Sequence, residues 1–308
     1  MSALKKLAIS VGDLNGVGFE IILKTHEKIK DLCEPIYCIN YTMAHQAADL
    51  LKKQIPNDFK MFKVGGEFTI TPGEVSSSSG KYSFDSFISA VDLARSGAVD
   101  AIVTLPINKE SWMMAGIEYK GHTDALRDIF KQEAIMMLGC DKLYVALFTE
   151  HIPLREVLKH INVAELSDFM IRFCNSTHAQ TIGVLGVNPH AGDNGVLGDE
   201  ERFIIEAIAN ANAHLGKDIF KGPLVPDVAF TPHNRKNFTY YIAMYHDQGL
   251  GPLKALYFDE SINVSLGLPI VRTSVDHGTA FDIAYCGKAA NLSYINAVVA
   301  AIELKGRA

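Results

Sequence analysis

The stretch that decides the fold is Tyr240–Ala284, which reads YYIAMYHDQGLGPLKALYFDESINVSLGLPIVRTSVDHGTAFDIA. It contains two short apolar runs, Tyr241–Tyr245 and Ile262–Val264. Runs of this length are typical of strands that are buried on both faces of a sheet. Polar residues and glycines follow at His246–Gly249 and at Arg272–Thr279. Because ligands of open α/β sheets bind where strands end, we expect a ligand crevice at these two segments.

Strand and helix patterns alternate along the rest of the chain. The other predicted strands are Leu7–Val11, Pro35–Asn40, Val99–Leu105, Leu143–Thr149, Thr181–Val187 and Val228–Phe230. The predicted helices are Phe19–Lys30, Tyr41–Lys53, Ser83–Ser96, one that ends at Phe130, one near 164–175, and Leu292–Leu304. The serine-rich segment Val75–Gly80 predicts an exposed, flexible loop. This alternation indicates an α/β protein with mostly parallel sheets.

The composition is that of a globular protein. Hydrophobic residues make up 48% of the 308 residues and the net charge is -6, which argues against binding to nucleic acid or to a membrane surface. No apolar run reaches the length of about 18 residues that a transmembrane helix needs. The N-terminal apolar run is too short for a signal peptide. The five cysteines form no CxxC pair, so we expect reduced thiols in a cytoplasmic protein.

A glycine-rich turn, GDLNGVG at Gly12–Gly18, joins the first predicted strand to the first predicted helix. The backbone N–H groups of such a turn can bind an anion at the start of the helix. The turn lacks both the GxGxxG pattern and the Lys-Ser/Thr pair of a phosphate loop. Two interpretations are therefore open, an anion-binding loop and a tight turn without a ligand.

Three histidines, His151, His190 and His246, each follow closely on a predicted buried strand. Imidazole is the commonest nitrogen ligand of a divalent transition metal, and three such ligands leave coordination positions open for a substrate. There is no HExxH motif, and a histidine at a strand end is also typical of an ordinary polar residue. A catalytic metal site and three independent polar residues are both compatible with this spacing.

Other polar residues near these strand ends are candidates for catalysis and substrate binding. Asp227 and Asp247 are the nearest carboxylates, and such groups act as metal ligands, as general bases or as partners that fix an imidazole tautomer. Lys254, Asn263 and Arg272 add hydrogen-bond donors. Cationic donors near a metal indicate a phosphorylated or carboxylated substrate. Solvated surface charge is the simpler alternative for Lys254 and Arg272.

Four motifs together resemble the 4-hydroxythreonine-4-phosphate dehydrogenases of vitamin B6 synthesis. They are GHTD at 121–124, NPHAGDNG at 188–195, MYHDQGLGPLK at 244–254 and NVSLGLPIVRTSVDHGTAFDIA at 263–284. The resemblance extends from about Ala8 to the C-terminus. The segment DHGTAFDIA, followed by GKAAN, is also similar to the nucleotide loop of isocitrate and isopropylmalate dehydrogenases.

The resemblance implies a fold of two α/β/α domains with mostly parallel sheets, like that of isocitrate and isopropylmalate dehydrogenases. Residues 1–120 and 265–308 would form the first domain, with the nucleotide-binding loop. Residues 121–264 would form the second domain, with the metal ligands and the dimer interface. The family also implies a homodimer whose active site lies in the interdomain cleft and is completed by the partner chain.

The functional residues of the family carry over to the matching positions of this sequence. The implied metal ligands are His151, His190 and His246, and the implied aspartates that maintain the site are Asp227 and Asp247. The implied substrate-binding residues are His122, Thr123, Lys254, Asn263 and Arg272. The implied cofactor-binding residues are His277, Gly278, Thr279, Ala280, Asp282 and Asn291.

The implied activity is an oxidation of 4-phosphooxy-L-threonine that depends on NAD, or on NADP, and on a divalent metal. Zinc, magnesium, manganese and cobalt all remain open as that metal. The alternatives are a paralogous dehydrogenase of 4-phospho-threonate or 4-phospho-erythronate, a phosphate acyltransferase on the same broad fold, and a non-catalytic ligand-binding protein. One departure from the family is the first turn, where GDLNGVGFE at Gly12–Glu20 replaces a pattern close to G-[DE]-P-A-G-[IV]-G-P-E.

Overall fold

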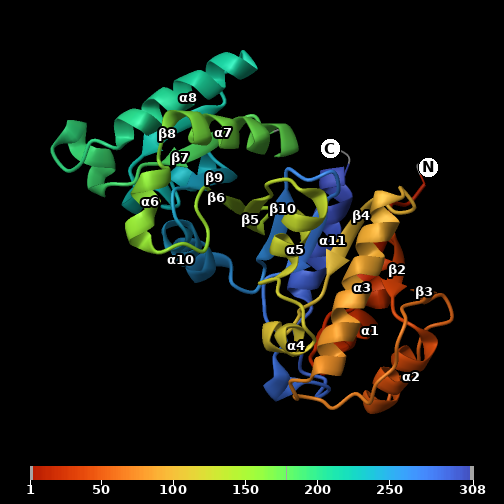
Figure 1. Ribbon diagram of the computed structural model, residues 1–308. Coiled ribbons are helices and arrows are strands. Elements are labelled where there is room, and N and C mark those ends of the chain that lie inside the picture. Colours follow the sequence, from red (N-terminus) through yellow and green to blue (C-terminus); the bar gives the residue numbers. More distant parts are fainter. Residues whose placement is uncertain (1–2, 178, 306–308) are drawn as a thin grey trace. The chain divides into compact units, whose positions relative to one another are not determined.

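The computed structural model describes residues 3–177 and 179–305, and the chain divides into two compact units. The first unit contains residues 3–133, 262–264 and 268–305. The second unit contains residues 134–261 and 265–267. Strands and helices alternate in both units (Figure 1), which confirms the predicted α/β class. The family-implied domains, divided after residues 120 and 264, differ from these units at their edges and stay a prediction.

A sheet with the strand order β3-β2-β1-β4-β11-β10 forms the centre of the first unit. The pairs β3/β2, β2/β1, β1/β4 and β4/β11 are all parallel. Every residue of β4 and of β11 is buried, as expected of strands that are covered on both faces. The bounds of these strands are β1 (Lys6–Ser10), β2 (Glu34–Cys38), β3 (Lys60–Phe62), β4 (Ala101–Thr104), β10 (Ile262–Leu266) and β11 (Arg272–Val275).

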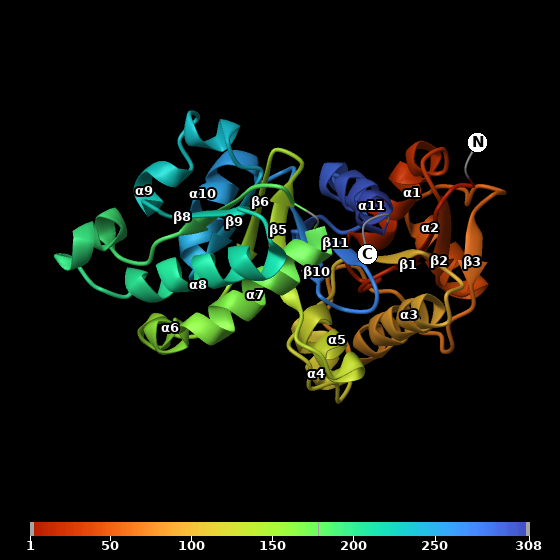
Figure 2. The ribbon, with the colours of Figure 1, turned by 90° about the horizontal axis from the view of Figure 1, so that it is seen from above.

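Helices cover both faces of this sheet. Figure 2 shows α1 and α11 on one face and α3 on the other. The helix α2 begins where the side chain of Asn40 accepts a hydrogen bond from the N–H of Met43 at 2.9 Å, which is a typical N-cap. The bounds are α1 (Gly18–Ile29), α2 (Tyr41–Leu50), α3 (Ser77–Arg95), α4 (Lys109–Met114), α5 (His122–Phe130), η3 (Phe281–Ile283) and α11 (Leu292–Lys305).

The serine-rich segment is the start of α3, so the predicted exposed loop at Val75–Gly80 is wrong there. Ser76 is the N-cap of the helix, and its Oγ accepts a hydrogen bond from the N–H of Ser79 at 3.2 Å. Ser79 and Gly80 are buried. A Cβ atom at Gly80 would lie 2.0 Å from the carbonyl oxygen of Ser111, at the start of α4. The serines therefore cap the helix, and the glycine lets α3 and α4 approach each other closely.

The strands of the second unit follow one another in the sheet order β5-β6-β9-β7-β8. The strands β5 and β6 form an antiparallel hairpin, whereas β6/β9, β9/β7 and β7/β8 are parallel. Together with the first unit, these pairings confirm the prediction of mostly parallel sheets. The bounds are β5 (Ile135–Cys140), β6 (Leu143–Leu147), β7 (Ile182–Leu185), β8 (Phe220–Leu224) and β9 (Tyr240–Ala243).

Helices also lie on both faces of the second sheet, with α7 and α8 on one face and α10 on the other (Figure 2). Leu250 and Leu253 of α10 pack with Val145 and Tyr241 of the sheet in one hydrophobic cluster. In the described part of the chain no helix is long and apolar enough to cross a membrane. The bounds are α6 (Leu154–His160), α7 (Val163–Thr177), η1 (Pro189–Gly195), α8 (Glu201–Leu215), α9 (Pro226–Ala229), η2 (Asn234–Lys236) and α10 (His246–Tyr257).

Two further sequence predictions are wrong. Val228–Phe230, predicted as a strand, belongs to the short helix α9 and its end, because Pro226 stands in the first turn, where proline favours a helix. Arg272–Val275, predicted as a polar strand exit, is the buried strand β11. Its polar side chains find partners inside the protein; for example, Thr273 Oγ1 donates to the carbonyl oxygen of Ala297 at 2.8 Å. The prediction of unpaired cysteines is confirmed, since all five are free.

Candidate active site

A buried arginine, Arg272, is the centre of a polar cluster in the first unit. It begins β11 beside β4, so its guanidinium reaches Thr104 at the end of β4. Thr104 Oγ1 accepts hydrogen bonds from Nε and Nη2 of Arg272 at 3.0 and 2.8 Å, and Nη1 donates to Asn263 Oδ1 at 3.4 Å. Only 3% of Arg272 is exposed. Burial lowers its pKa to about 9, so an anionic ligand would stabilise its charged form.

Arg272 also fixes the tautomer of His122. Its Nη2 lies 3.1 Å from Nδ1 of His122. Because a guanidinium only donates hydrogen bonds, Nδ1 must be the acceptor, and the proton of the neutral ring is therefore on Nε2. Nε2 is buried, and no described residue pairs with it. Burial and the charge of Arg272 hold the pKa of His122 well below 6.5, so this ring is a neutral hydrogen-bond donor.

The other predicted substrate-binding residues lie in two places. Thr123 follows His122 in the first turn of α5 and is also buried. Asn263 contacts Arg272, as described. Lys254 belongs to the second unit, in the last turn of α10, where its Nζ lies 5.6 Å from the centre of the Phe258 ring. The structure therefore brings His122 and Asn263 each into contact with Arg272, and Lys254 lies on α10 of the second unit.

Two of the three predicted metal ligands lie side by side in the second unit. The ring centroids of His151 and His246 are 5.5 Å apart. The reason is topological: β6 and β9 are parallel neighbours, so the chain segments that follow them emerge at the same edge of the sheet. His246 Nδ1 lies 2.7 Å from Asp247 Oδ1, which leaves Nε2 for a ligand. A histidine held by a carboxylate in this way is typical of metal sites.

His190, the third predicted ligand, does not join this pair. Within residues 3–177 and 179–305, no group of potential ligand atoms within 4.8 Å of one another contains all three histidines. His190 is exposed in η1, where residues 190–194 all have positive φ angles. The carboxylate of Glu201 anchors the start of this segment by accepting the N–H groups of Val187 and Asn188 at 2.8 and 2.7 Å. The pair of histidines fits a divalent cation, and the third ligand does not fit with η1 in this conformation.

The two predicted aspartates differ in their surroundings. Asp247 is exposed in the first turn of α10 and contacts His246. Asp227 is exposed in the first turn of α9, and α9 packs beside η1, which carries His190. Each aspartate is therefore close in structure to a segment with a predicted metal ligand, although neither is itself part of a described ligand group.

The predicted cofactor loop lies against the first turn of the chain and against α1. The carbonyl oxygen of Thr279 accepts the N–H of Val17 at 3.0 Å. The buried carboxylate of Glu20 accepts the N–H groups of Gly287 and Ala289 at 3.1 and 2.9 Å. These bonds hold residues 279–289 in a defined backbone conformation within the first unit.

Among the predicted cofactor residues, His277 has a free hydrogen-bonding atom. Its Nδ1 lies 3.0 Å from the carbonyl oxygen of Gly278, so Nδ1 carries the proton and Nε2 is an acceptor. That Nε2 is buried and has no described partner, which suits a donor group of a ligand. Asn291 donates to Thr25 Oγ1 at 3.1 Å. Gly278 and Asp282 are exposed, and Thr279 and Ala280 are half-buried.

Backbone N–H groups of the turn at residues 12–18 donate hydrogen bonds to acceptors within the protein. The N–H of Asn15 donates to Asp13 Oδ1 at 2.9 Å, that of Gly16 to the carbonyl oxygen of Asp13 at 3.0 Å, and that of Val17 to the cofactor loop. Ser79 Oγ donates to the other oxygen of Asp13 at 3.1 Å, and burial raises the pKa of this carboxyl group. With these donors taken, the tight turn without a ligand is the favoured interpretation.

A cavity of about 310 Å³ lies beside the cofactor loop. Its lining consists of Glu20 and Lys24 of α1, residues 50–53 at the end of α2, and residues 285–287. The residues at 52 and 53 are both lysines, so a ligand on this side of the loop would meet three basic side chains. Lys24 Nζ donates to the carbonyl oxygen of Ala289 at 2.9 Å.

Three residues of the first-unit cluster are missing from the sequence prediction. Thr104 holds Arg272, and the rings of Phe87 and Trp112 pack around His122. Thr104 had a signal, because it is a polar residue at the end of an apolar strand, like the predicted histidines. Phe87 and Trp112 had none, because aromatic residues at helical spacing predict an ordinary core.

Two α/β units, a buried arginine–histidine cluster and a histidine pair at the ends of parallel strands define an α/β enzyme for a small anionic substrate. The chain belongs to the family described as pyridoxal phosphate biosynthetic protein PdxA, whose model matches residues 27–301.

Two relatives that align over nearly the whole chain are both named 4-hydroxythreonine-4-phosphate dehydrogenase. A 4-hydroxythreonine-4-phosphate dehydrogenase of Sulfurimonas denitrificans is 61% identical over 302 residues, which cover 98% of each chain. The protein of that name from Campylobacter fetus subsp. fetus is 56% identical over 303 residues, 98% of this chain and 99% of its own. The crystal structure of 4-hydroxythreonine-4-phosphate dehydrogenase from Klebsiella pneumoniae is similar with a TM-score of 0.83, 34% identity and 99% coverage of both chains.

Proposed function

We propose that this chain is an NAD-dependent 4-hydroxythreonine-4-phosphate dehydrogenase of pyridoxal phosphate biosynthesis. It would oxidise 4-phosphooxy-L-threonine to 2-amino-3-oxo-4-phosphooxybutanoate. This product is a β-keto acid, which loses carbon dioxide readily and gives 3-amino-2-oxopropyl phosphate. Membership of the PdxA family, and relatives of that name with identities of 61% and 56% over 98% of the chain, support the proposal.

The observation that carries the substrate assignment is the burial of Arg272 beside the neutral donor His122. A guanidinium and an imidazole N–H both donate, so they can bind the oxygens of a phosphate or a carboxylate group. Because burial disfavours the charge on Arg272, an anionic substrate would gain affinity by compensating it. Thr123, Asn263 and Lys254 complete the proposed substrate-binding set.

The proposed metal ligands are His151, His190 and His246, of which the first and the last already form a pair. A third ligand from His190 would require a different conformation of η1. When bound, a divalent metal would supply Lewis-acid chemistry that lowers the pKa of the substrate hydroxyl group. Asp247 holds His246 through Nδ1 and so orients its Nε2, and Asp227 is the proposed second carboxylate that maintains the site. Zinc, magnesium, manganese and cobalt are the proposed candidates.

The nicotinamide cofactor, NAD or alternatively NADP, would take the hydride from the substrate. The proposed binding segment is the loop that the first turn and α1 hold in place. In it, the unpaired Nε2 of His277 can accept a hydrogen bond from the cofactor. The proposed cofactor-binding residues are His277, Gly278, Thr279, Ala280, Asp282 and Asn291.

We also propose a homodimer, as the family resemblance implies, and a cytoplasmic location, which suits five free cysteines of which four are buried. Light scattering coupled to size-exclusion chromatography tests the dimer. A mass close to the 33.7 kDa of one chain would contradict it.

The decisive experiment is a steady-state assay of NADH formation with 4-phosphooxy-L-threonine and added divalent metal. We expect turnover that stops after chelation of the metal and returns when metal is added back. Parallel assays with 4-phospho-threonate and 4-phospho-erythronate test the paralogous activity. A higher kcat/KM for either hydroxy acid would overturn the substrate assignment, and the absence of an NADH signal with all three would overturn the dehydrogenase.

A further inference from the structure

His122 packs against two aromatic rings in the first unit. The ring of Phe87, on α3, lies edge-to-face at 4.8 Å between centroids, with an interplanar angle of 63°. The indole of Trp112, on α4, lies edge-to-face on it at 5.5 Å and 82°. Phe87 and Trp112 are both fully buried. Close packing of this kind restricts rotation of the imidazole about its χ angles.

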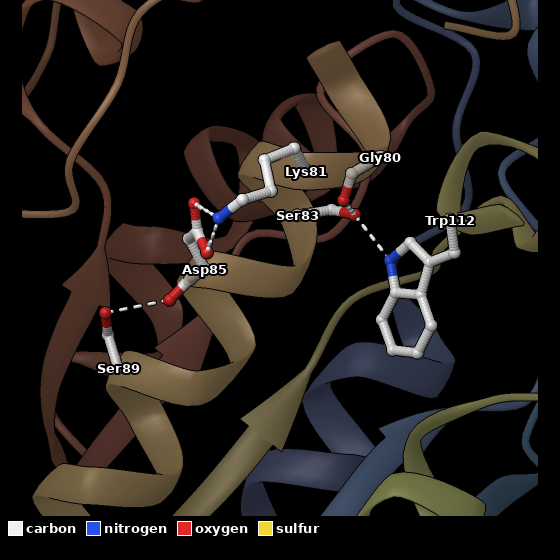
Figure 3. Close-up of polar contacts among 6 residues, drawn as sticks. All are labelled: Gly80, Lys81, Ser83, Asp85, Ser89 and Trp112. Atoms are coloured by element: carbon white, nitrogen blue, oxygen red, sulfur yellow. Dashed lines mark hydrogen bonds and ion pairs between the residues drawn. The ribbon is translucent and has the colours of Figure 1, made fainter. Parts of the chain in front are cut away.

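The indole is itself held by a hydrogen bond to α3. Trp112 Nε1 donates to Ser83 Oγ at 2.8 Å, and that hydroxyl donates in turn to the carbonyl oxygen of Gly80 at 2.8 Å (Figure 3). These three polar atoms therefore form one chain of hydrogen bonds from the indole to the backbone of α3. Gly80 is also where α3 and α4 meet, because a Cβ there would overlap the backbone of Ser111.

We propose that Ser83, Trp112 and Phe87 are positioning residues, which hold His122 so that its Nε2–H faces the substrate as a fixed donor. Arg272 sets the tautomer from the Nδ1 side. The aromatic rings set the ring plane, and Ser83 sets the indole. The unpaired, buried Nε2 is the free end of this arrangement. The inference rests on the proposed function in one respect, the use of that N–H to bind the phosphorylated substrate.

The chain offers a matched control on the same helix. Ser89 Oγ donates to the carbonyl oxygen of Asp85 at 2.8 Å, just as Ser83 Oγ donates to that of Gly80 (Figure 3). Only Ser83 also accepts the indole N–H. Replacing either serine with alanine removes one side-chain bond to a helix carbonyl. The two variants differ in whether Trp112 loses its partner.

The first test compares the kinetics of Ser83→Ala and Ser89→Ala with 4-phosphooxy-L-threonine. Because a fixed donor binds the substrate in the ground state and the transition state alike, its loss raises KM more than it lowers kcat. For Ser83→Ala we expect KM to rise about tenfold, the size of one lost hydrogen bond to a charged group. Ser89→Ala should keep the KM of the unaltered protein. Equal KM values in the two variants would overturn the proposal.

The second test needs no enzymatic activity, and its first measurement uses the unaltered protein. Nitrogen-15 NMR of histidine-labelled protein distinguishes a ring protonated at Nε2 from one protonated at Nδ1. We expect His122 as a single Nε2–H tautomer in the unaltered protein, and a mixture or an exchange-broadened signal in Ser83→Ala. His122 protonated at Nδ1 in the unaltered protein would overturn the proposal, even if Ser83→Ala fails to fold.

The two tests separate this proposal from the proposed function. A single Nε2–H tautomer that is disturbed by Ser83→Ala, in a protein that does not turn over 4-phosphooxy-L-threonine, supports the positioning and removes the substrate assignment. The opposite outcome is normal turnover in a protein whose His122 tautomer and KM do not change in Ser83→Ala. That outcome supports the proposed function and contradicts the positioning role of Ser83.

Discussion

The two groups of predicted site residues are built in opposite ways. In the first unit, Arg272 and His122 are 3% and 7% exposed and are held by Thr104 and by each other. In the second unit, His151 and His190 are exposed, and the His246 side chain is 38% exposed. The first group has its hydrogen bonds and tautomer already set. In the second group, His246 contacts a neighbouring aspartate that is itself 89% exposed.

The difference shows where each group would obtain its order. Burial and packing fix the arginine–histidine cluster before a ligand arrives, at the cost of desolvating a cation. Exposed imidazoles keep their solvation and depend on a shared ligand, such as a metal, for a common geometry. Substitutions in the arginine–histidine cluster should therefore change both stability and substrate binding, whereas substitutions of the exposed histidines should change ligand binding alone.

The largest effect is expected from Arg272→Ala. It removes the buried cation that we assign to the anionic substrate, a loss of about 3 kcal/mol of binding free energy or a factor of more than 100 in kcat/KM. We expect most of the loss in KM, and steady-state kinetics measure it. Arg272→Lys, which keeps the charge but not the fork of donors, should recover part of it. An unchanged KM would show that the arginine–histidine cluster does not bind the substrate.

The next effect concerns stability and compares one helical glycine from each unit. Gly80→Ala places a Cβ 2.0 Å from the Ser111 carbonyl oxygen and should lower the free energy of unfolding by about 2–3 kcal/mol, as overpacking does. Gly251 lies in α10, and beyond its chain neighbours and its own helix no atom lies within 4 Å of its added Cβ. The helix propensity of alanine favours Gly251→Ala, and the following Pro252 opposes it, so the free energy of unfolding should change by less than about 1 kcal/mol. Denaturant titration measures both. Similar losses in both variants would show that helix packing at Gly80 is not tight.

A third effect is the dependence of stability on pH. The folded state holds the pKa of His122 well below its ordinary value of 6.5, so below about pH 6.5 the unfolded chain binds more protons than the folded one. Stability should therefore fall as the pH is lowered through this window, with a slope of up to about 1.4 kcal/mol per pH unit. His122→Asn should lose this part of the slope in denaturant titrations at pH 5 to 7. Equal slopes in the two proteins would show that His122 is protonated in the folded state.

Much of the fold could be predicted from the sequence, because apolar runs at strand and helix spacing report burial directly. The runs Tyr241–Tyr245 and Ile262–Val264 correspond to β9 and β10. The strand β11 was hidden, since its polar residues Arg272, Thr273 and Ser274 resemble a loop and are buried only because β4 and α11 supply partners. The start of α3 was hidden for the same reason, since its serines serve as a cap and as packing surface.

The site could be predicted from motifs only as far as single residues. The motifs indicated His122 and Arg272, and the structure brings them within 3.1 Å. Neither spacing nor composition shows that the ring of Trp112 packs against His122. The same holds for the hydrogen bond that the indole N–H donates to Ser83. Such contacts between α3, α4 and α5 depend on how the helices pack. The same limit applies to His190, whose distance from the other two histidines depends on the conformation of η1.

The smallest change in stability is expected from His246→Ala. This residue is partly exposed and begins α10, so its removal should change the free energy of unfolding by less than about 0.5 kcal/mol. The bound divalent metal and the metal-dependent turnover should nevertheless be lost, because His246 supplies the nitrogen that Asp247 orients. His160→Ala is the matched control, an exposed histidine at the end of α6 in the same unit. Calorimetric titration with Zn²⁺ or Mn²⁺ should detect binding to this control and not to His246→Ala. Equal metal affinity in the two variants would show that the exposed pair of histidines is not a metal site.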